Sequence, residues 1–297
     1  MIEVKNVSKS FEGFKALDGI SLTVPTGAIY GLVGPNGSGK STLIRNLMGI
    51  YRPDSGEILL DGEPIYENPA VKQRIAYIPD DVFYFLQSTV KDLMRFYRGI
   101  YPDFDMERYE KLKGVFALSE NMPIRRMSKG MQKQAAFWLA VCMRPDIMVL
   151  DEPVDGLDPV MRRQVWSIIV SDVAERGVTV LVSSHNLREL EDVCDHVGII
   201  DHGKLLLERS LSELQENISK VQIALPGDKE LPEGLNILHS TATGRLHTII
   251  VRGKPQEVLA LLQEAEPLFV DALPLSLEEI FIYELGGADY AVKDIIL

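Results

Sequence analysis

The sequence predicts an α/β fold in which helices cover a parallel sheet, followed by a small α+β unit. Continuous apolar runs at residues 29–33, 146–150 and 178–182 have the composition of buried parallel strands. Segments with helical spacing alternate with these runs through short turns, which is the order of a parallel sheet. Near residue 212 the chain becomes polar and leads into a second pattern of strands and helices.

Composition narrows the classes of function. The 297 residues suffice for one large domain and a smaller one. An apolar content of 46% and a charged content of 25% are ordinary for a globular protein with a sizeable core. The net charge of −12 argues against broad nucleic-acid binding, which requires a basic face.

The cysteines and the apolar runs indicate the compartment. Cys142 and Cys194 lie in apolar surroundings without metal-ligand spacing, so we expect buried, reduced thiols in a cytosolic protein. The N-terminus lacks the basic and apolar segments of a signal peptide. No run approaches the roughly 18 to 20 apolar residues of a spanning helix. A role at a membrane would therefore need another chain to cross it.

The chain up to residue 80 is expected to be mainly β around one helix. Residues 2–7 alternate with the period of a half-buried strand. The run after Thr42 begins a helix. Phe11 is placed in a loop between the first two strands, and a lone phenylalanine is most often part of a core. The expected strands are 2–7, 20–24, 29–33, 57–60 and 75–79.

Residues 88–145 are expected to be mainly helical. Apolar side chains at positions 90, 93, 94 and 97 have helical spacing. Ser128 is placed to cap a helix that extends to Met143. The aromatic stretch Val82–Leu86 precedes this region, and its residues belong either to the core or to an exposed apolar patch.

The rest of the chain continues the alternation and then changes. The final unit of about 75 residues is near the lower limit for independent folding and contains no cluster of chemically active residues. The expected elements are strands 146–150, 178–182 and 197–201 with helices 160–174 and 187–194, then a connecting helix 212–220, strands 221–225, 247–252 and 268–273, and helices 255–264 and 276–285.

The most specific motif joins the strand 29–33 to the first helix. Its glycines let successive N–H groups point inward as an anion nest, and the helix that follows adds the positive end of its dipole. We expect Lys40 to reach the β- and γ-phosphates and the Ser41 hydroxyl to ligate Mg²⁺. A chance match in a surface loop is the alternative, but the flanking strand and helix argue against it. The motif is Gly34, Pro35, Asn36, Gly37, Ser38, Gly39, Lys40, Ser41 and Thr42, which fits the Gly-x-x-x-x-Gly-Lys-Ser pattern of a phosphate-binding loop.

Polar groups also follow two later strands. Asp151 and Glu152 end the strand 146–150, at the edge where ligands of open α/β sheets bind. Ser184 and His185 follow the strand 178–182 in the same way. Taken alone, Glu152 could cap the next turn, and a lone histidine is usually structural.

Five motifs in this order resemble an ABC-type ATPase subunit over residues 1–212. They are the phosphate loop, Met127–Gln132, Asp151-Glu152, Asp155–Asp158 and Ser184-His185. The resemblance implies a P-loop NTPase fold, with a RecA-like parallel core, an antiparallel β subdomain and a helical subdomain at about residues 88–145. Residues 213–297, which include the segment Ser276–Phe281, resemble the small accessory domain of ABC-2-type exporter subunits.

The resemblance also implies roles for individual residues. Asp151 would hold Mg²⁺, Glu152 would orient and deprotonate the attacking water, and His185 would contact the γ-phosphate. Phe11 and Ala16 would lie against the adenine of ATP. Two subunits would sandwich two ATP molecules, so hydrolysis would require a dimer. The residues that would contact the partner's ATP are Ser128, Lys129, Gly130 and Asp158.

Two positions depart from the commonest pattern of that family. Asp80 stands where a glutamine usually contacts Mg²⁺ and the attacking water. A carboxylate can still ligate Mg²⁺, or it can compete with Glu152 for the water. Lys129 and Met131 replace residues of the segment usually written Leu-Ser-Gly-Gly-Gln. The charge of Lys129 either strengthens contact with the γ-phosphate or is simply solvated. Since the hydrolytic residues are all present, we expect an active ATPase.

The leading hypothesis is therefore the ATP-hydrolysing subunit of a membrane transporter, with export favoured by the resemblance. It would lie in the cytoplasm on the inner face of the cell membrane, paired with a second, identical or different ATPase subunit. Separate membrane-spanning subunits would dock at Val82–Leu86. The alternatives are a soluble ABC-type ATPase acting on ribosomes or DNA, and a small-molecule phosphotransferase. The first usually has two ATPase units or a coiled-coil insertion, and the second leaves Ser128 and His185 without a role.

Overall fold

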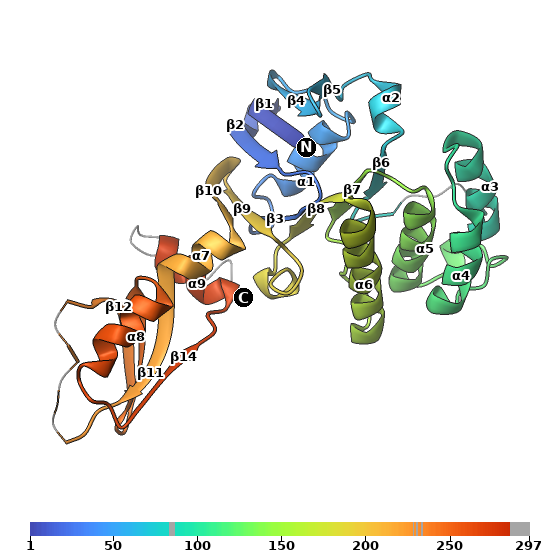
Figure 1. Ribbon diagram of the computed structural model, residues 1–297. Coiled ribbons are helices and arrows are strands. Elements are labelled where there is room, and N and C mark those ends of the chain that lie inside the picture. Colours follow the sequence, from blue (N-terminus) through green and yellow to red (C-terminus); the bar gives the residue numbers. More distant parts are fainter. Residues whose placement is uncertain (83–86, 228, 230, 233, 286–297) are drawn as a thin grey trace. The chain divides into compact units, whose positions relative to one another are not determined.

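The structure is a computed structural model that describes residues 1–82, 87–227, 229, 231–232 and 234–285 (Figure 1). The chain divides into two compact units. The first comprises residues 1–185 and 193–208, and the second comprises residues 186–192 and 209–297. The predicted boundary between residues 212 and 213 falls inside helix α7 (Leu211–Asn217), which belongs to the second unit.

The first unit contains a six-stranded sheet in the order β10-β9-β3-β8-β7-β6. Parallel pairing joins β3 to β8 and β9, and β7 to β6 and β8. These registers set Val33 beside Ser184, and Asp151 beside Ser183. Three carboxyl ends of parallel strands therefore meet at one edge. The strands are β3 (Ile29–Val33), β6 (Ile75–Ile78), β7 (Ile147–Asp151), β8 (Thr179–Ser184), β9 (His196–Asp201) and β10 (Lys204–Ser210).

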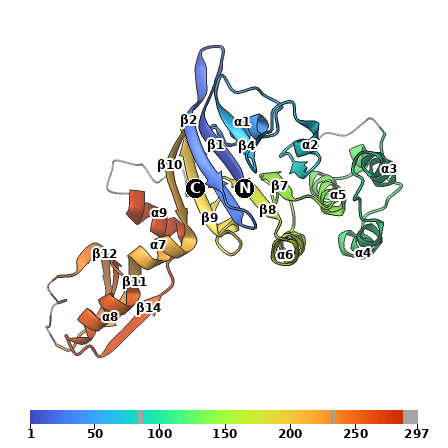
Figure 2. The same ribbon diagram turned by 45° about the horizontal axis from the view of Figure 1, so that its top comes forward.

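A second, antiparallel sheet in the order β2-β1-β4-β5 belongs to the same unit. Helix α1 (Lys40–Leu47) lies beside the strands of the antiparallel sheet (Figure 2). Its Leu43, Ile44 and Leu47 belong to a core that also holds residues of both sheets. This packing holds the phosphate loop, which directly precedes α1, between two rigid layers. The strands are β1 (Ile2–Phe11), β2 (Phe14–Val24), β4 (Ser55–Leu60) and β5 (Glu63–Pro64), and the short helix α2 (Pro69–Lys72) follows them.

A group of helices extends from the β6 edge of the six-stranded sheet (Figure 1). Trp138 of α5 stacks on Tyr109 of α4 with ring centroids 4.6 Å apart, and its indole N–H donates to the Tyr109 carbonyl. Ser128 caps α5 as predicted, since its hydroxyl accepts from the Met131 N–H at 3.2 Å. The helices are α3 (Val90–Ile100), α4 (Met106–Phe116), the 3₁₀ turn η1 (Ile124–Arg126), α5 (Lys129–Cys142) and, after β7, α6 (Pro159–Arg176).

The second unit is an antiparallel sheet in the order β12-β13-β11-β14 with helices. Val258 and Leu262 of α8 pack on Val221, Ile223 and other buried residues of the sheet. The elements are α7 (Leu211–Asn217), β11 (Ile218–Ala224), β12 (Asn236–Thr243), β13 (Leu246–Arg252), α8 (Pro255–Gln263), β14 (Phe269–Leu273) and α9 (Leu277–Leu285).

The predicted helix 187–194 is wrong. The structure has only the 3₁₀ turn η2 (Leu187–Glu189), followed by an irregular segment. Within the second unit the Leu277 N–H of α9 donates to Glu191, and Arg188 pairs with Glu278 at 2.8 Å. These tertiary contacts replace the helical hydrogen bonds that local propensity favoured.

Other local predictions need smaller corrections. Phe11 is the last residue of β1 and not a loop residue. The expected elements do not include strands β10 and β12. Strand β12 is exposed along almost its whole length and so lacks the apolar alternation that predicts a strand. The predicted α/β class is confirmed. None of the helices in the described part of the chain has the length and apolar character needed to cross a membrane.

Candidate active site

The phosphate loop connects β3 to α1 in a conformation that requires glycine. Gly37 and Gly39 have φ values of 81° and 114°, in the region that L side chains rarely adopt. A Cβ on Gly34 would lie 2.1 Å from the Ile200 carbonyl oxygen. Gly39 is also the N-cap of α1 and offers no side-chain cap to the first turn. The helix N-terminus is therefore open to an anion.

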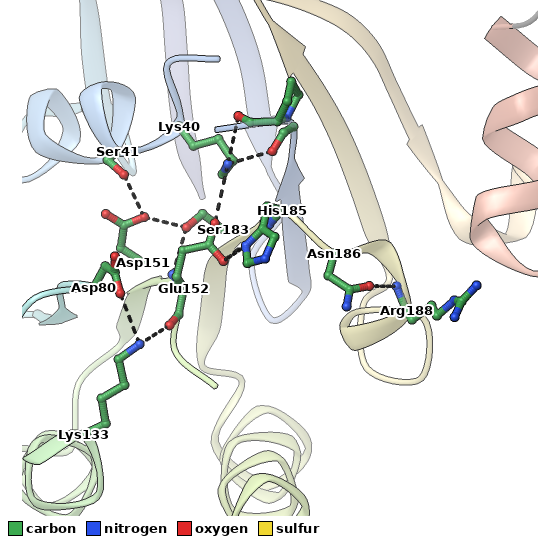
Figure 3. A network of polar contacts seen from close by, with 12 residues as sticks. Lys40, Ser41, Asp80, Lys133, Asp151, Glu152, Ser183, His185, Asn186 and Arg188 are labelled. Carbon is green, nitrogen blue, oxygen red and sulfur yellow. Dashed lines mark hydrogen bonds and ion pairs between the residues drawn. The ribbon is translucent and has the colours of Figure 1, made fainter. Parts of the chain in front are cut away.

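Lys40 links this loop to the carboxylate after β7. Its ammonium donates to the Gly34 carbonyl at 2.7 Å and the Pro35 carbonyl at 3.3 Å. It also lies 3.5 Å from the Glu152 carboxylate (Figure 3). The Lys40 side chain is only 5% exposed, so its charge acts in an environment that screens it weakly. Such an ammonium is well placed to contact phosphate oxygens entering the loop.

The oxygen groups at the loop fit a magnesium ion. The Ser41 hydroxyl lies 3.2 Å from Asp151 Oδ1, and Ser183 donates to the same oxygen at 2.6 Å. Hydroxyl and carboxylate oxygens are ligands that Mg²⁺ prefers. Ser38 Oγ is buried and has no hydrogen-bond partner among the described residues. A buried polar atom without a partner is unusual and costs free energy, which a polar ligand or water would restore. Ser41 and Asp151 are the residues that would hold the ion.

Glu152 and His185 form the second part of the site. The ring nitrogen Nδ1 of His185 lies 2.9 Å from Glu152 Oε2, and the His185 N–H donates to the same oxygen at 3.4 Å. Glu152 has a φ of 46°, which is uncommon for a residue with a side chain. Strained backbones of this kind cost on the order of 1–3 kcal/mol and cluster at functional sites. The structure thus brings Lys40, Glu152 and His185 together.

Three further residues lie at this site to which the sequence assigned no individual role, although Asp155 begins the motif Asp155–Asp158. Ser183 accepts from the Glu152 N–H at 3.1 Å as well as donating to Asp151. Asp155 has a carboxylate oxygen within 4.8 Å of ligating atoms of Glu152 and His185. Lys133 donates to the Glu152 carbonyl at 2.5 Å. Ser183 could have been found from its place at the end of a buried strand, whereas Lys133 lies inside a helix with no local signal.

The two departures from the family pattern meet in the structure. Asp80 Oδ1 lies 3.3 Å from Lys133 Nζ and 3.6 Å from Lys129 Nζ. Lys129 also pairs with Asp81 at 3.5 Å, and attraction to Asp80 and then Asp81 raises the pKa of Lys129. The ammonium of Lys129 is thus held in ion pairs with Asp80 and Asp81 and is not simply solvated. The role of Asp80 as a metal ligand stays a prediction.

The residues assigned to the partner's nucleotide lie at two adjacent helix starts. A Cβ on Gly130 would lie 2.5 Å from the Gly156 carbonyl oxygen, so the start of α5 touches the turn 155–158 closely. Asp158 caps α6 by accepting from the Val160 and Met161 N–H groups, both at 3.0 Å. The turn that follows Glu152 therefore lies against Gly130 at the start of α5. Contact of these residues with a second subunit stays a prediction.

The residues predicted to contact adenine, Phe11 and Ala16, lie near the start of the chain on β1 and β2. Ala16 lies against the end of the loop, since a Cβ on Gly39 would lie 2.7 Å from its carbonyl oxygen. Phe11 is 38% exposed, and its ring packs edge-on against Tyr51 with centroids 5.2 Å apart. Phe11 is therefore not a core residue, and its stacking on a base stays a prediction. The expected docking stretch Val82–Leu86 lies, apart from Val82, outside the described residues.

Both cysteines are free and buried, as predicted. Burial raises the pKa of the Cys142 thiol to about 12 and raises the pKa of Cys194 as well. Neither thiol is ionised at neutral pH, so neither is a nucleophile for the chemistry of this site.

Comparison with known proteins agrees with this geometry. The family model for ABC transporters matches residues 17–155. The ABC transporter ATP-binding protein YtrB of Bacillus subtilis is 37% identical over 288 residues, covering 97% of this chain and 99% of the relative. The Nod factor export ATP-binding protein I of Burkholderia lata is 30% identical over 296 residues, covering 96% of this chain and 97% of the relative.

Solved structures share the fold of the first part of the chain. An ATP-binding subunit of an ABC transporter superposes with a TM-score of 0.67 and 26% identity, covering 72% of this chain and 92% of that one. A dimeric post-hydrolysis state of the ATP-binding cassette MJ0796, bound to ADP and phosphate, gives a TM-score of 0.63 and 21% identity. It covers 71% of this chain and 99% of that one. This second likeness shows the fold alone.

Proposed function

Because this chain belongs to the ABC transporter family as an ATP-binding subunit, we propose that it hydrolyses ATP with Mg²⁺ to power transport. The observation that carries the proposal is the convergence of two groups on one carboxylate. Glu152 lies between the phosphate-loop ammonium of Lys40 and the ring of His185. A carboxylate placed between a phosphate-binding group and a histidine is suited to act on a water that attacks the terminal phosphate.

The residues of this chain divide the reaction between them. The loop N–H groups and Lys40 bind and orient the phosphates, because they present positive charge in a weakly screened site. Glu152 accepts the proton of the attacking water, and His185 holds the Glu152 carboxylate while contacting the γ-phosphate. When bound at Ser41 and Asp151, Mg²⁺ neutralises charge that develops on the phosphate oxygens. Ser183 keeps Asp151 aligned.

The proposal extends to a dimer. Ser128, Lys129, Gly130 and Asp158 of one subunit would contact the ATP held by the other, and the N-terminus of α5 suits an anion. Closure on ATP binding and opening after hydrolysis would move attached subunits.

The partners and the location follow from the same proposal. Separate membrane-spanning subunits would receive the motion, with the protein on the cytoplasmic face of the cell membrane. The name of the Nod factor export relative supports export as the direction. The soluble alternative, acting on ribosomes or DNA, is not favoured by the comparisons, because the relatives are transporter subunits.

The test is phosphate release by the purified chain followed by capture of its partners. We expect release that requires Mg²⁺ and ATP. Tagged Glu152→Gln protein held in Mg-ATP and extracted from native cells in mild detergent should retain multi-spanning membrane chains in fixed proportion. Absence of phosphate release in the presence of those chains would refute the hydrolytic proposal. Ribosomal or DNA-bound partners without a membrane chain would refute the transport proposal.

A further inference from the structure

Lys133 is a charged residue in an unusual place. It lies in the second turn of α5, and its side chain is 0% exposed. Removing an ammonium from water is costly, and burial is tolerated only where partners compensate the charge. The partners here are the Glu152 carbonyl oxygen at 2.5 Å and Asp80 Oδ1 at 3.3 Å (Figure 3). Both belong to the site described above.

The backbone of Glu152 has a conformation that needs stabilising contacts. Glu152 has a positive φ of 46°, which residues with a side chain rarely adopt, and the following Pro153 biases it further toward an extended backbone. Its backbone is held from two sides, by Ser183 on the N–H and by Lys133 on the carbonyl. Rotation to an extended conformation would swing the carboxylate away from Lys40 and His185. The hydrogen bond from Lys133 therefore opposes the relaxation that would disorganise the site.

The ion pair with Asp80 connects Lys133 to a further segment of the chain. Asp80 follows β6, Lys133 belongs to the helix that Ser128 caps, and Glu152 follows β7. One buried ammonium thus joins three segments that are distant in the sequence. Lys129 reaches the same Asp80 oxygen, but its side chain is 59% exposed and its ion pairs are with Asp80 and Asp81. Of the two lysines, Lys133 is therefore the one expected to affect the conformation of Glu152, because it donates to the Glu152 carbonyl.

We propose that Lys133 is a positioning residue for hydrolysis, which holds the Glu152 peptide in its left-handed conformation and couples it to Asp80. This inference rests on the proposed ATPase activity. Lys133 touches neither water nor phosphate in the reaction, and it acts through the main chain of Glu152. Its removal should therefore lower turnover while leaving the phosphate loop, and hence ATP affinity, largely intact.

The test compares Lys133→Gln with the wild-type full-length chain in steady-state phosphate release and in equilibrium ATP binding. Loss of a hydrogen bond from a charged donor predicts a decrease in kcat of at least about tenfold. We expect ATP affinity to change by less than about threefold, since the loop contacts remain. Lys133→Arg keeps the charge and should recover part of the lost turnover. Lys111→Gln is the matched control, because it removes an exposed lysine that pairs with Glu107 on α4.

A double variant adds a readout that general destabilisation would not produce. If Asp80 acts through Lys133, Asp80→Asn combined with Lys133→Gln should lower kcat no more than Lys133→Gln alone. An unchanged kcat for Lys133→Gln in an active wild-type background would overturn the inference. So would parallel losses of turnover, ATP affinity and melting temperature in both Lys133 variants. A wild-type chain that releases no phosphate with its membrane partners would instead overturn the proposed function and this inference with it.

Discussion

The two units differ in how deeply they bury the charged side chains compared here. At the carboxyl edge of the six-stranded sheet, the side chains of Lys40 and Lys133 are 5% and 0% exposed. In the second unit, Lys220 and Glu279 pair at 2.6 Å with side chains 23% and 28% exposed, and Arg188 is 70% exposed. Buried charges lose hydration and persist where partners compensate them, whereas exposed pairs contribute about 0–1 kcal/mol each. The difference indicates that chemistry belongs to the first unit.

A second contrast points the same way. Within the described residues, the cluster of acidic and histidine side chains close enough to share a ligand is Glu152, Asp155 and His185. These three follow the ends of β7 and β8. On the sheet of the second unit, Gln222 is hydrogen-bonded to Thr248 and Lys220 to Glu279. The cluster that could share a ligand therefore belongs to the first unit.

The largest expected effect comes from Glu152→Gln. The amide keeps the shape of the side chain but cannot accept the proton of water, so turnover should fall by about 10²–10⁴-fold. ATP binding should persist, and the variant should elute as a dimer in saturating Mg-ATP on size-exclusion chromatography. Glu107→Gln, which changes an exposed carboxylate 79% accessible to solvent, is the control. A monomer under these conditions would count against the sandwich arrangement.

A smaller effect is expected from Asp80→Ala. The change removes the Asp80 carboxylate that pairs with the buried ammonium of Lys133, and a buried charge without that compensation weakens the support of Glu152. We expect turnover to fall by about tenfold and ATP affinity to fall less. Isothermal titration with ATP beside a phosphate-release assay separates the two quantities. Equal losses in both would mean that Asp80 has a general structural role.

Removal of residues 209–297 should have a still smaller effect on nucleotide binding. The phosphate loop, Asp151, Glu152 and His185 all belong to the first unit, which has its own core. We expect the dissociation constant for ATP to change by less than about threefold, because a compact unit with its own core retains its structure. Fluorescence titration with a nucleotide analogue measures this. Loss of binding in a folded truncated protein would show that the boundary is misplaced.

The smallest effect concerns the pair Lys220–Glu279. Partial burial raises the pKa of Glu279, but hydrogen bonds from Lys220 and Ser276 outweigh it and hold the pKa below the ordinary 4.5. A lowered folded-state pKa stabilises the protein above the unfolded pKa, and this contribution is lost as pH falls through the folded pKa. Lys220→Met should therefore reduce the free energy of unfolding of the second unit by less than about 1 kcal/mol at pH 7.

Calorimetry at two pH values tests this sign. The difference between Lys220→Met and the wild type should shrink below pH 4.5, where Glu279 becomes protonated in the folded protein. A difference that grows on acidification would contradict the assignment. The matched comparison is Lys229→Met, whose partner Glu266 is 85% exposed.

Prediction from the sequence succeeded where the signal was local and failed where it was not. The cap at Ser128, the helix after Thr42 and the strands ending at Val33 and Asp151 follow from spacing and composition over a few residues. The predicted helix 187–194 failed, because the segment is held by α9 from almost a hundred residues away.

By itself, the sequence determined the phosphate loop and the order of the site motifs. Glycines that permit positive φ, a lysine and a helix start act within a dozen residues, so their pattern specifies their structure. Only the tertiary structure decided which groups surround Glu152. The ammonium of Lys133 and the hydroxyl of Ser183 reach it because helix packing and sheet register bring together residues 19 and 31 positions apart. No local pattern encodes those distances, since they depend on every layer packed between the segments.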